Sequence, residues 1–258
     1  MKRTSDGSAG DVDYGKFGRT YARYRRPDPA IAAQIERALG SAQTVLNVGA
    51  GAGSYEPADR LVTAVEPSAS MRAQRPASLP QAVDAYAEDL PFSDDSFDAS
   101  MSTVSIHQWA DLELGLAEMR RVTRGRIVLL VCDPARMHDY WLSDYIPEVR
   151  ENEARRFPPI HRISKALAGQ IEIENVPVPL NCTDGFNEAY YGRPEAFLDG
   201  DARLACSSWS AIDDEVLKRF VAHLSSDLKS GLWDKKYGHL RTKPYFDGPL
   251  RLIIASPD

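Results

Sequence analysis

The chain has 258 residues, of which 43% are hydrophobic, with 17 glycines and 17 prolines, a composition typical of one globular domain with or without a cap. Acidic residues outnumber Lys and Arg by 37 to 31, giving a net charge of −6, so nucleic acid is not an expected substrate. No stretch approaches the roughly 18 apolar residues of a membrane span, and the three widely spaced cysteines predict neither a disulfide framework nor a zinc site. We therefore expect an unprocessed cytoplasmic protein with no metal and no membrane partner.

The first half of the chain alternates between predicted helices and strands. A helix is predicted over residues 14–39, where Ile31, Ile35 and Leu39 recur with a spacing of four and Gly40 follows as a stop. The elements after it are strands at 44–48, 60–67, 82–88 and 96–105, a helix at 111–123 and a buried strand at 125–133. Such alternation predicts an α/β protein with a doubly wound, mostly parallel sheet and a ligand crevice at the carboxyl ends of its strands.

Beyond Asp133 the pattern is less regular. An aromatic and charged stretch at 139–168 reads as helical, and 171–179 reads as an edge strand. Val216, Phe220, Leu224 and Leu228 lie on one face of a further predicted helix, and residues 250–256 form a final strand that can return to the sheet.

The most informative short stretch is "VLNVGAGAGSYE", residues 45–56, which follows the first strand. It has no Lys after its glycines, so it is not a phosphate-binding P-loop. Its spacing is GxGxG, and the third place of a dinucleotide fingerprint falls on Ser54, which disfavours a nicotinamide cofactor. Glu66, at the end of the second strand, can accept hydrogen bonds from both hydroxyls of a ribose, whichever nucleotide is bound.

Four segments in order, "VLNVGAGAG", "VEPSASM", "AEDLPFSDDSFD" and "STVSIHQWAD", make the chain resemble the class I S-adenosylmethionine-dependent methyltransferases. The resemblance covers about residues 20–133 and is to the small-molecule group that includes the ubiquinone and trans-aconitate methyltransferases. It implies a Rossmann-like fold with a seven-stranded sheet, an N-terminal lid helix and a C-terminal helical cap. The implied parts are a tail and lid (1–30), a cofactor-binding core (31–133), a cap with an edge strand (134–245) and a returning strand (246–258).

The resemblance also implies which residues hold S-adenosylmethionine. Gly49 and Gly51 would let the backbone approach its methionine portion, Glu66 would hold the ribose, and Met71 would pack on the adenine. Ala87 would donate its backbone N–H to the ring, and a carbonyl near Thr103 would meet the amino-acid end. The full predicted set is Arg25, Asn47, Gly49, Ala50, Gly51, Gly53, Glu66, Pro67, Met71, Ala87, Glu88 and Thr103.

The sequence departs from the family pattern at two positions. Asn47 stands where an acidic residue is usual, so its side-chain oxygen can accept a bond from the cofactor ammonium or a water only without charge assistance. Tyr86 replaces the acidic residue that commonly reads the adenine amino group, and Glu88 is a candidate substitute.

The catalytic candidates are His107, which follows the fourth strand, and Tyr21 in the lid segment "YARYR". His107 is either a base that takes a proton from the acceptor or a residue that orients it, because an imidazole titrates near neutral pH. Many aromatic residues lie in the lid and the second half of the chain, and their convergence over the crevice would suit a planar acceptor.

The predicted function is transfer of a methyl group from S-adenosylmethionine to a nitrogen, oxygen or carbon of a small, aromatic or heteroaromatic metabolite. Two alternatives remain: a nicotinamide-dependent oxidoreductase, and a non-catalytic protein that binds the cofactor and activates a partner. No motif identifies the acceptor or an oligomeric state.

Overall fold

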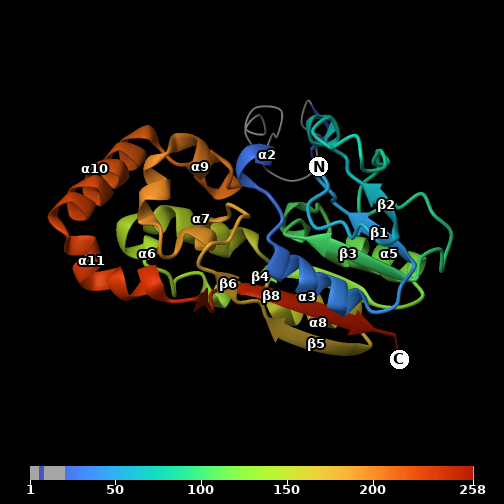
Figure 1. Ribbon diagram of the computed structural model, residues 1–258. Coiled ribbons are helices and arrows are strands. Elements are labelled where there is room, and N and C mark those ends of the chain that lie inside the picture. Colours follow the sequence, from blue (N-terminus) through green and yellow to red (C-terminus); the bar gives the residue numbers. More distant parts are fainter. Residues whose placement is uncertain (1–5, 9–20, 258) are drawn as a thin grey trace.

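The computed structural model describes residues 6–8 and 21–257, apart from the side chains of residues 21 and 22. Its centre is a sheet with the strand order β2-β1-β3-β4-β8-β5 (Figure 1). The first four strands of this order are mutually parallel, whereas β8 runs antiparallel to both of its neighbours. The strands are β1 (Thr44–Val48), β2 (Leu61–Val65), β3 (Ala99–Thr103), β4 (Ile127–Cys132), β5 (Gln170–Asn175) and β8 (Leu250–Ser256). The mostly parallel α/β sheet predicted from the sequence is confirmed.

The sheet has six strands in the part of the chain described here, not seven. The strand expected at 82–88 is reduced to a single parallel bridge between Val65 and Val83. Val83 donates its N–H to the Ala64 carbonyl and accepts from the Glu66 N–H, after which the chain leaves the sheet edge. This departure carries Ala87 and Glu88 away from the sheet and into the wall of a cleft.

Helices cover both faces of the sheet. All six residues of β4 are buried, as expected for a strand covered on both sides. Val128 and Leu130 face the cluster that contains Ile31 and Ile35 of α3 (Pro29–Leu39), whereas Ile127 and Leu129 face the opposite cluster. That second cluster contains residues of α5 (Leu112–Val122) and α8 (Ile160–Leu167).

The long helix expected at 14–39 is interrupted. Residues 14–20 lie outside the described part of the chain, α2 covers only Tyr21–Tyr24, and α3 begins afresh at Pro29. Pro27 has no N–H to donate and disfavours helical geometry at the residue before it. Asp28 then caps α3 by accepting from the Ala30 N–H at 2.9 Å.

Residues 134–245 form most of a second lobe beside the sheet, but they also supply β5 and α8 to the sheet region (Figure 1). The remaining helices are α4 (Ala69–Arg72), α6 (Leu142–Tyr145), α7 (Pro147–Arg156), α9 (Gly200–Leu204), α10 (Asp214–Ser230) and α11 (Leu232–Tyr237). Short 3-10 helices are η2 (Ile106–Gln108), η3 (Pro134–Arg136), η4 (Asn187–Tyr190), η5 (Pro194–Leu198), η6 (Ser207–Trp209) and η7 (Gly238–Thr242). A separate two-stranded sheet is formed by β6 (Val178–Pro179) and β7 (Tyr245–Phe246), which are antiparallel.

The aromatic residues of the lobe mainly pack on one another. Trp141 contacts the rings of Trp233 and Phe197 with centroids 5.5 and 5.7 Å apart, and Trp209 stacks on Phe197 at 5.6 Å. All four side chains are buried, so they stabilise the lobe and are not available to contact a ligand.

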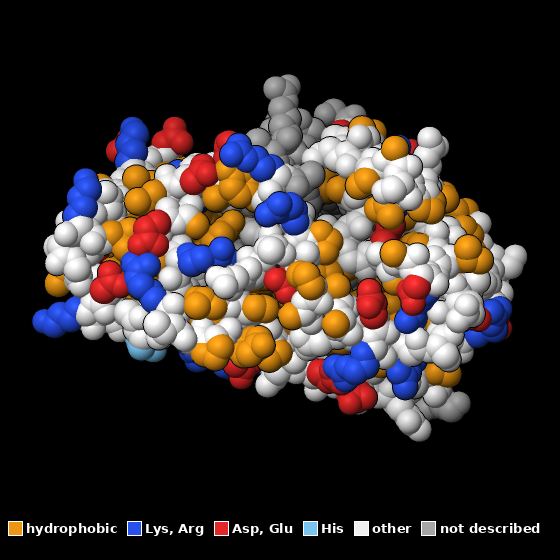
Figure 2. Space-filling view, viewed as in Figure 1, with side chains coloured by type: hydrophobic (Ala, Val, Ile, Leu, Met, Phe, Trp, Pro, Cys, Tyr) orange, Lys and Arg blue, Asp and Glu red, His pale blue; other side chains and the backbone are white. Residues whose placement is uncertain are grey.

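On the face shown in Figure 2, basic and acidic side chains are interspersed and do not separate into one basic stripe. Within the described ranges, no helix is long and apolar enough to cross a bilayer.

Candidate active site

Two cavities adjoin at the carboxyl ends of β3 and β4. The first, which we call the cofactor cleft, is lined mainly by loops that follow β1, β2 and β3. The second, which we call the acceptor cavity, lies between η2 and the lobe. Val104, the residue after β3, lines both. Two adjacent cavities at this sheet edge suit a reaction between two bound molecules.

The glycine loop forms one wall of the cofactor cleft. Gly49, Gly51 and Gly53 have φ values of 68°, 52° and 93°, a region that L-residues with side chains rarely adopt. A Cβ on Gly49 would lie 1.9 Å from Ser105 Oγ, so this position also lets the loop pack against the Ser105 side chain. Gly49 and Gly51 line the cleft as predicted, whereas Gly53 shapes the turn without lining it.

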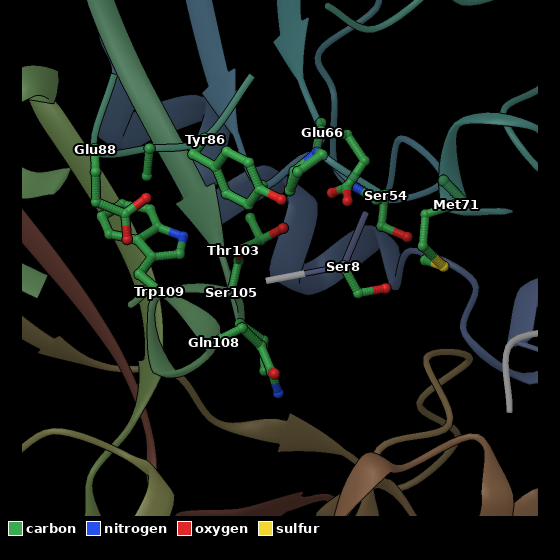
Figure 3. Close-up of a pocket in the computed structure, with 17 residues that line it drawn as sticks. Ser8, Ser54, Glu66, Met71, Tyr86, Glu88, Thr103, Ser105, Gln108 and Trp109 are labelled. Carbon is green, nitrogen blue, oxygen red and sulfur yellow. The ribbon is translucent and has the colours of Figure 1, made fainter. Parts of the chain in front are cut away.

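Glu66, the residue after β2, lines the cleft near Ser54 (Figure 3). Its carboxylate accepts the N–H of Gly51 at 2.8 Å through Oε2 and the N–H of Ser68 at 2.8 Å through Oε1. Burial raises the pKa of this carboxyl, against the two backbone hydrogen bonds that favour its ionised form. Each oxygen keeps a second lone pair, so the carboxylate can still accept hydrogen bonds from a ligand hydroxyl.

The structure places most of the predicted cofactor residues on this cleft. Those that line it are Gly49, Ala50, Gly51, Glu66, Pro67, Met71, Ala87, Glu88 and Thr103. Arg25, expected near the cofactor carboxylate or the substrate, does not line the cofactor cleft; it lines the acceptor cavity, where its Nε lies 2.5 Å from Asp184 Oδ1.

Asn47 is fully buried beneath the glycine loop and does not line the cleft. Its Nδ2 donates to Glu56 Oε1 at 3.0 Å, and Glu56 in turn forms a buried two-point ion pair with Arg75 at 2.8 and 2.9 Å. Glu56 places a carboxylate beside Asn47, but Arg75 neutralises its charge. This network supports the glycine loop on its buried side. Asn47 Oδ1 is buried and has no hydrogen-bond partner among the described residues, so the acceptor role predicted for it stays a prediction.

Sequence reasoning did not assign a role to Ser8, Ser54, Ser105 or Gln108, all of which line the cofactor cleft (Figure 3). Ser8 reaches the cleft because Asp6 accepts the hydroxyls of Ser68 and Ser70, each at 2.7 Å. Tyr86, which stands where an acidic residue was expected, donates to the Gly7 carbonyl at 2.9 Å. Ser54 lies within "VLNVGAGAGSYE", and Ser105 and Gln108 lie within "STVSIHQWAD", so the motifs contain three of these residues.

The cleft fits the cofactor expected from the motifs. Gln108 is 6% exposed, yet neither polar atom of its amide has a hydrogen-bond partner among the described residues. Such orphaned buried groups cost free energy unless a ligand pairs with them. Gln108 can pair with a polar amino-acid end, Glu66 with ribose hydroxyls, and Met71 with an apolar ring face. These are the three chemical parts of S-adenosylmethionine.

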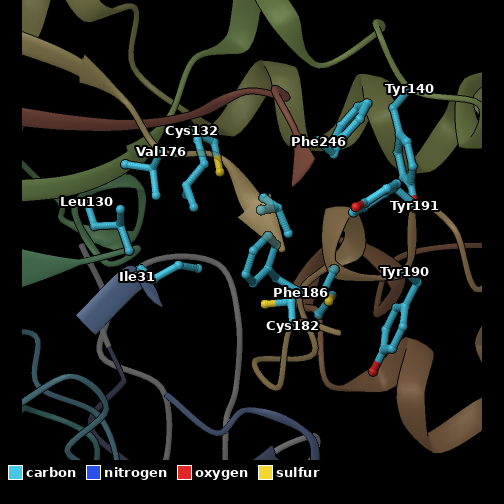
Figure 4. Close-up of a cluster of buried hydrophobic side chains, with 14 of the residues drawn as sticks. Ile31, Leu130, Cys132, Tyr140, Val176, Cys182, Phe186, Tyr190, Tyr191 and Phe246 are labelled. Atoms are coloured by element: carbon cyan, nitrogen blue, oxygen red, sulfur yellow. The ribbon is translucent and has the colours of Figure 1, made fainter. Parts of the chain in front are cut away.

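The acceptor cavity is lined by apolar and charged side chains together. Its apolar wall includes Phe157, Phe186 and Leu250, and Phe186 continues into the large buried cluster that joins sheet and lobe (Figure 4). Its charged residues are Arg25, Arg156, Glu153 and Glu188.

His107 lines this cavity from η2 and packs on Phe157, with ring centroids 4.2 Å apart. Its buried Nδ1 has no hydrogen-bond partner in the ranges described. Burial lowers the pKa of His107 well below its usual range, and the charges of Arg156 and Arg25 lower it further. The imidazole is therefore neutral at pH 7. Tyr21 lies in α2, but its side chain is outside the described structure.

Residues 46–130 match the model of a methyltransferase domain family. A protein from Anabaena variabilis ATCC 29413, whose crystal structure names it as a methyltransferase from an antibiotic biosynthesis pathway, is 32% identical to this chain in sequence. The two structures superpose with a TM-score of 0.83 over 90% of this chain and 98% of that chain. A methyltransferase from Thermotoga maritima shares the fold at a TM-score of 0.55 and 14% identity, covering 95% and 96% of the two chains.

Among curated proteins, the chain is 33% identical over 109 residues to the uncharacterised protein YafE of Escherichia coli K12, covering 41% of this chain. It is 35% identical over 107 residues to a malonyl-[acyl-carrier protein] O-methyltransferase of Erwinia billingiae, covering 38% of this chain. The alignments span 49% and 42% of these relatives' lengths, so the chain matches about half of each or less. The near-complete match to the Anabaena protein, together with the motifs and the cleft, shows that the chain belongs to the class I S-adenosylmethionine-dependent methyltransferases.

Proposed function

We propose that the protein transfers a methyl group from S-adenosylmethionine to a nitrogen, oxygen or carbon of a small aromatic or heteroaromatic molecule bound in the acceptor cavity. The observation that carries the proposal is the junction at Val104, which lines both cavities. A donor in one cavity and an acceptor in the other would meet there. When bound, S-adenosylmethionine supplies an electrophilic methyl group.

The residues of the chain would act chiefly by alignment and exclusion of water. The glycine loop, Glu66 and Gln108 would fix the donor, while Phe157 and Phe186 would cover the acceptor with apolar surface. Van der Waals contact on both sides of Val104 would hold the nucleophile in line with the methyl group.

His107 would orient the acceptor by accepting a hydrogen bond from its N–H or O–H. The depressed pKa leaves the imidazole unprotonated at neutral pH, but it also makes it a weak base, since general bases act best with a pKa near the working pH. We therefore favour positioning over lasting proton transfer. The role predicted for Tyr21 stays a prediction.

The charge and the cysteines support a small acceptor and a reducing location. The net charge of −6 and the interspersed surface charges do not favour a polyanion (Figure 2). Cys132, Cys182 and Cys206 are all buried free thiols, as is common in the cytoplasm. A nicotinamide cofactor is not favoured, because the fingerprint spacing and the family both point elsewhere.

Two measurements test this proposal. Calorimetry with S-adenosylhomocysteine should show binding, and absence of binding by folded protein at high micromolar ligand would contradict the assigned cofactor. Turnover of labelled S-adenosylmethionine should then be found with a panel of phenols, amines and indoles. Cofactor binding without turnover, in the panel and in cell extract, would favour the non-catalytic alternative. His107→Gln should lower turnover more than His161→Gln, a matched change at an exposed position of α8.

A further inference from the structure

The acceptor cavity has an acidic end built around one buried arginine. Arg150 of α7 is fully buried behind the wall, and its Nη2 donates to Glu188 Oε1 at 2.6 Å. Its Nη1 pairs with Glu153, and its Nε donates to the Met137 carbonyl at 2.8 Å. Glu153 and Glu188 line the cavity, but Arg150 does not. Two carboxylates that face the cavity thus share one cation.

The two carboxylates differ in how completely they are paired. Glu153 Oε1 accepts from Asn187 Nδ2 at 2.8 Å and from Ser208 Oγ at 3.2 Å, while its Oε2 accepts from Arg150. Glu188 is 3% exposed, and its Oε2 accepts no hydrogen bond within the described part of the chain. Because Glu188 lines the cavity, this carboxylate oxygen offers a place for a hydrogen-bond donor on the ligand.

The charges at this end favour a further cation. Burial raises the pKa of Glu153 to about 7, the charge of Arg150 opposes the rise, and the charge of Glu188 adds to it. The Glu153 carboxyl is therefore only partly ionised at neutral pH when the cavity holds no cation. A positive group on a ligand would take the place of the proton.

The part of the cavity around His107 offers a hydrogen-bond acceptor instead. The imidazole is neutral, and its buried Nδ1 has no hydrogen-bond partner among the described residues, so it can accept from a ligand hydroxyl. Arg25 and Arg156 also line the cavity, and each has other partners, among them Asp184 for Arg25 and Ser207 for Arg156. The cavity thus has a neutral acceptor at His107 and a carboxylate at Glu188, and Phe157 and Phe186 supply an apolar wall for a planar body.

We propose that the methyl acceptor is an amine-bearing aromatic alcohol, whose hydroxyl lies by His107 and whose protonated amine binds Glu188 and Glu153. The inference rests on the proposed function and names the class of acceptor for it. Methylation of the hydroxyl forms an O–CH₃ bond, breaks the S–CH₃ bond and releases the hydroxyl proton to solvent, with S-adenosylhomocysteine as the second product. No oxidant or reductant is involved.

The test compares three phenols that differ only in the group opposite the hydroxyl: tyramine, 4-ethylphenol and 3-(4-hydroxyphenyl)propionate. Each is titrated at pH 7 into protein saturated with S-adenosylhomocysteine. Tyramine should bind at least about tenfold more tightly than 4-ethylphenol, because its amine gains a charge-assisted hydrogen bond, and the propionate should bind most weakly. Tyramine binding should also release protons, detected as a dependence of the heat on the ionisation enthalpy of the buffer.

Glu188→Gln should reduce the affinity for tyramine to that for 4-ethylphenol. Glu174→Gln, which removes a carboxylate from the edge strand β5, is the matched control and should leave the preference intact. S-adenosylhomocysteine affinity within about twofold of wild type would show that the variant is folded and that the proposed cofactor stands.

Other results would overturn the inference. Equal binding of tyramine and 4-ethylphenol, tighter binding of the propionate, or failure of all three phenols to bind would each do so on the wild-type protein alone. An unchanged tyramine preference in Glu188→Gln would have the same effect. Failure of S-adenosylhomocysteine to bind would instead contradict the proposed function.

Discussion

The cofactor cleft and the acceptor cavity meet at Val104, but different kinds of interaction shape them. The cleft uses backbone geometry within short segments, namely three glycines with positive φ and one carboxylate that binds backbone N–H groups. The acceptor cavity uses side chains from distant segments, such as Arg150 with Glu188 and Arg25 with Asp184. Local backbone requirements leave a pattern in sequence, whereas long-range side-chain pairing does not.

The largest expected effect is on the acceptor side. Arg150→Met would leave Glu153 and Glu188 buried without their shared cation, which costs about 3–5 kcal/mol of unfolding free energy. Urea denaturation followed by fluorescence measures this loss. Arg219→Met is the control, because that side chain is 61% exposed in its pair with Glu148, and it should change the midpoint little. A loss below about 1 kcal/mol in Arg150→Met would show that the two carboxylates find other partners.

On the cleft side, Gly49→Ala should weaken S-adenosylhomocysteine binding by about a hundredfold. The new Cβ would lie 1.9 Å from Ser105 Oγ at a φ of 68°, so the loop is strained and either it or Ser105 must move. Gly238→Ala is the control, because its Cβ would meet its nearest atom at 3.6 Å. Calorimetry measures both. Unchanged affinity in Gly49→Ala would mean that the loop does not set the cofactor geometry.

The cleft and the sheet were therefore largely predictable. The "VLNVGAGAG" and "VEPSASM" segments located the glycine loop, Glu66 and Met71, because each is fixed by neighbours close in sequence. The reduction of strand 82–88 to one bridge could not be predicted from the sequence, because an edge strand has a single partner and its hydrophobic pattern is weak. Which of the two cavities Arg25 lines could not be predicted either, because its position depends on Asp184, which lies 159 residues away.

A pH measurement separates the acidic end of the acceptor cavity from the rest of the protein. With the pKa of Glu153 raised to about 7, the folded state holds a proton that the unfolded state has lost, so the stabilising contribution is present below about pH 4.5 and is lost as the pH rises through 7. Arg150, Glu188, Asn187 and Ser208 are the groups that face this carboxylate. The variant Glu153→Gln has no carboxyl that titrates at this position. The stability of wild type relative to Glu153→Gln should fall between pH 5 and pH 8 by an amount on the order of 1–3 kcal/mol.

Urea denaturation of both proteins at each pH gives this difference. The comparison matters because His107, whose pKa is lowered, changes the stability of both proteins in the same way and in the opposite sense. A difference that stays constant or grows with pH would contradict the buried, proton-sharing carboxylate.

The smallest effect concerns how α8 packs on α5 of the cofactor-binding core. Arg162 of α8 pairs with Glu113 of α5 at 2.6 and 2.7 Å, and both side chains are 52% exposed. Arg162 lowers the pKa of Glu113, so the pair contributes above the ordinary carboxyl range and is lost as the pH falls, but solvent and salt screen it. Ile163, one residue along, is fully buried against the same helix region. Removing one of its methyl groups should therefore matter more than removing the ion pair.

Glu113→Gln should leave the urea midpoint nearly unchanged, and whatever shift it causes should vanish in 0.5 M salt. Ile163→Val should lower the unfolding free energy by about 1 kcal/mol at either salt concentration, because the lost methyl group leaves a cavity that salt does not fill. A larger, salt-sensitive loss in Glu113→Gln than in Ile163→Val would reverse the conclusion. It would make a surface ion pair, not buried packing, the attachment of α8 to the cofactor-binding core.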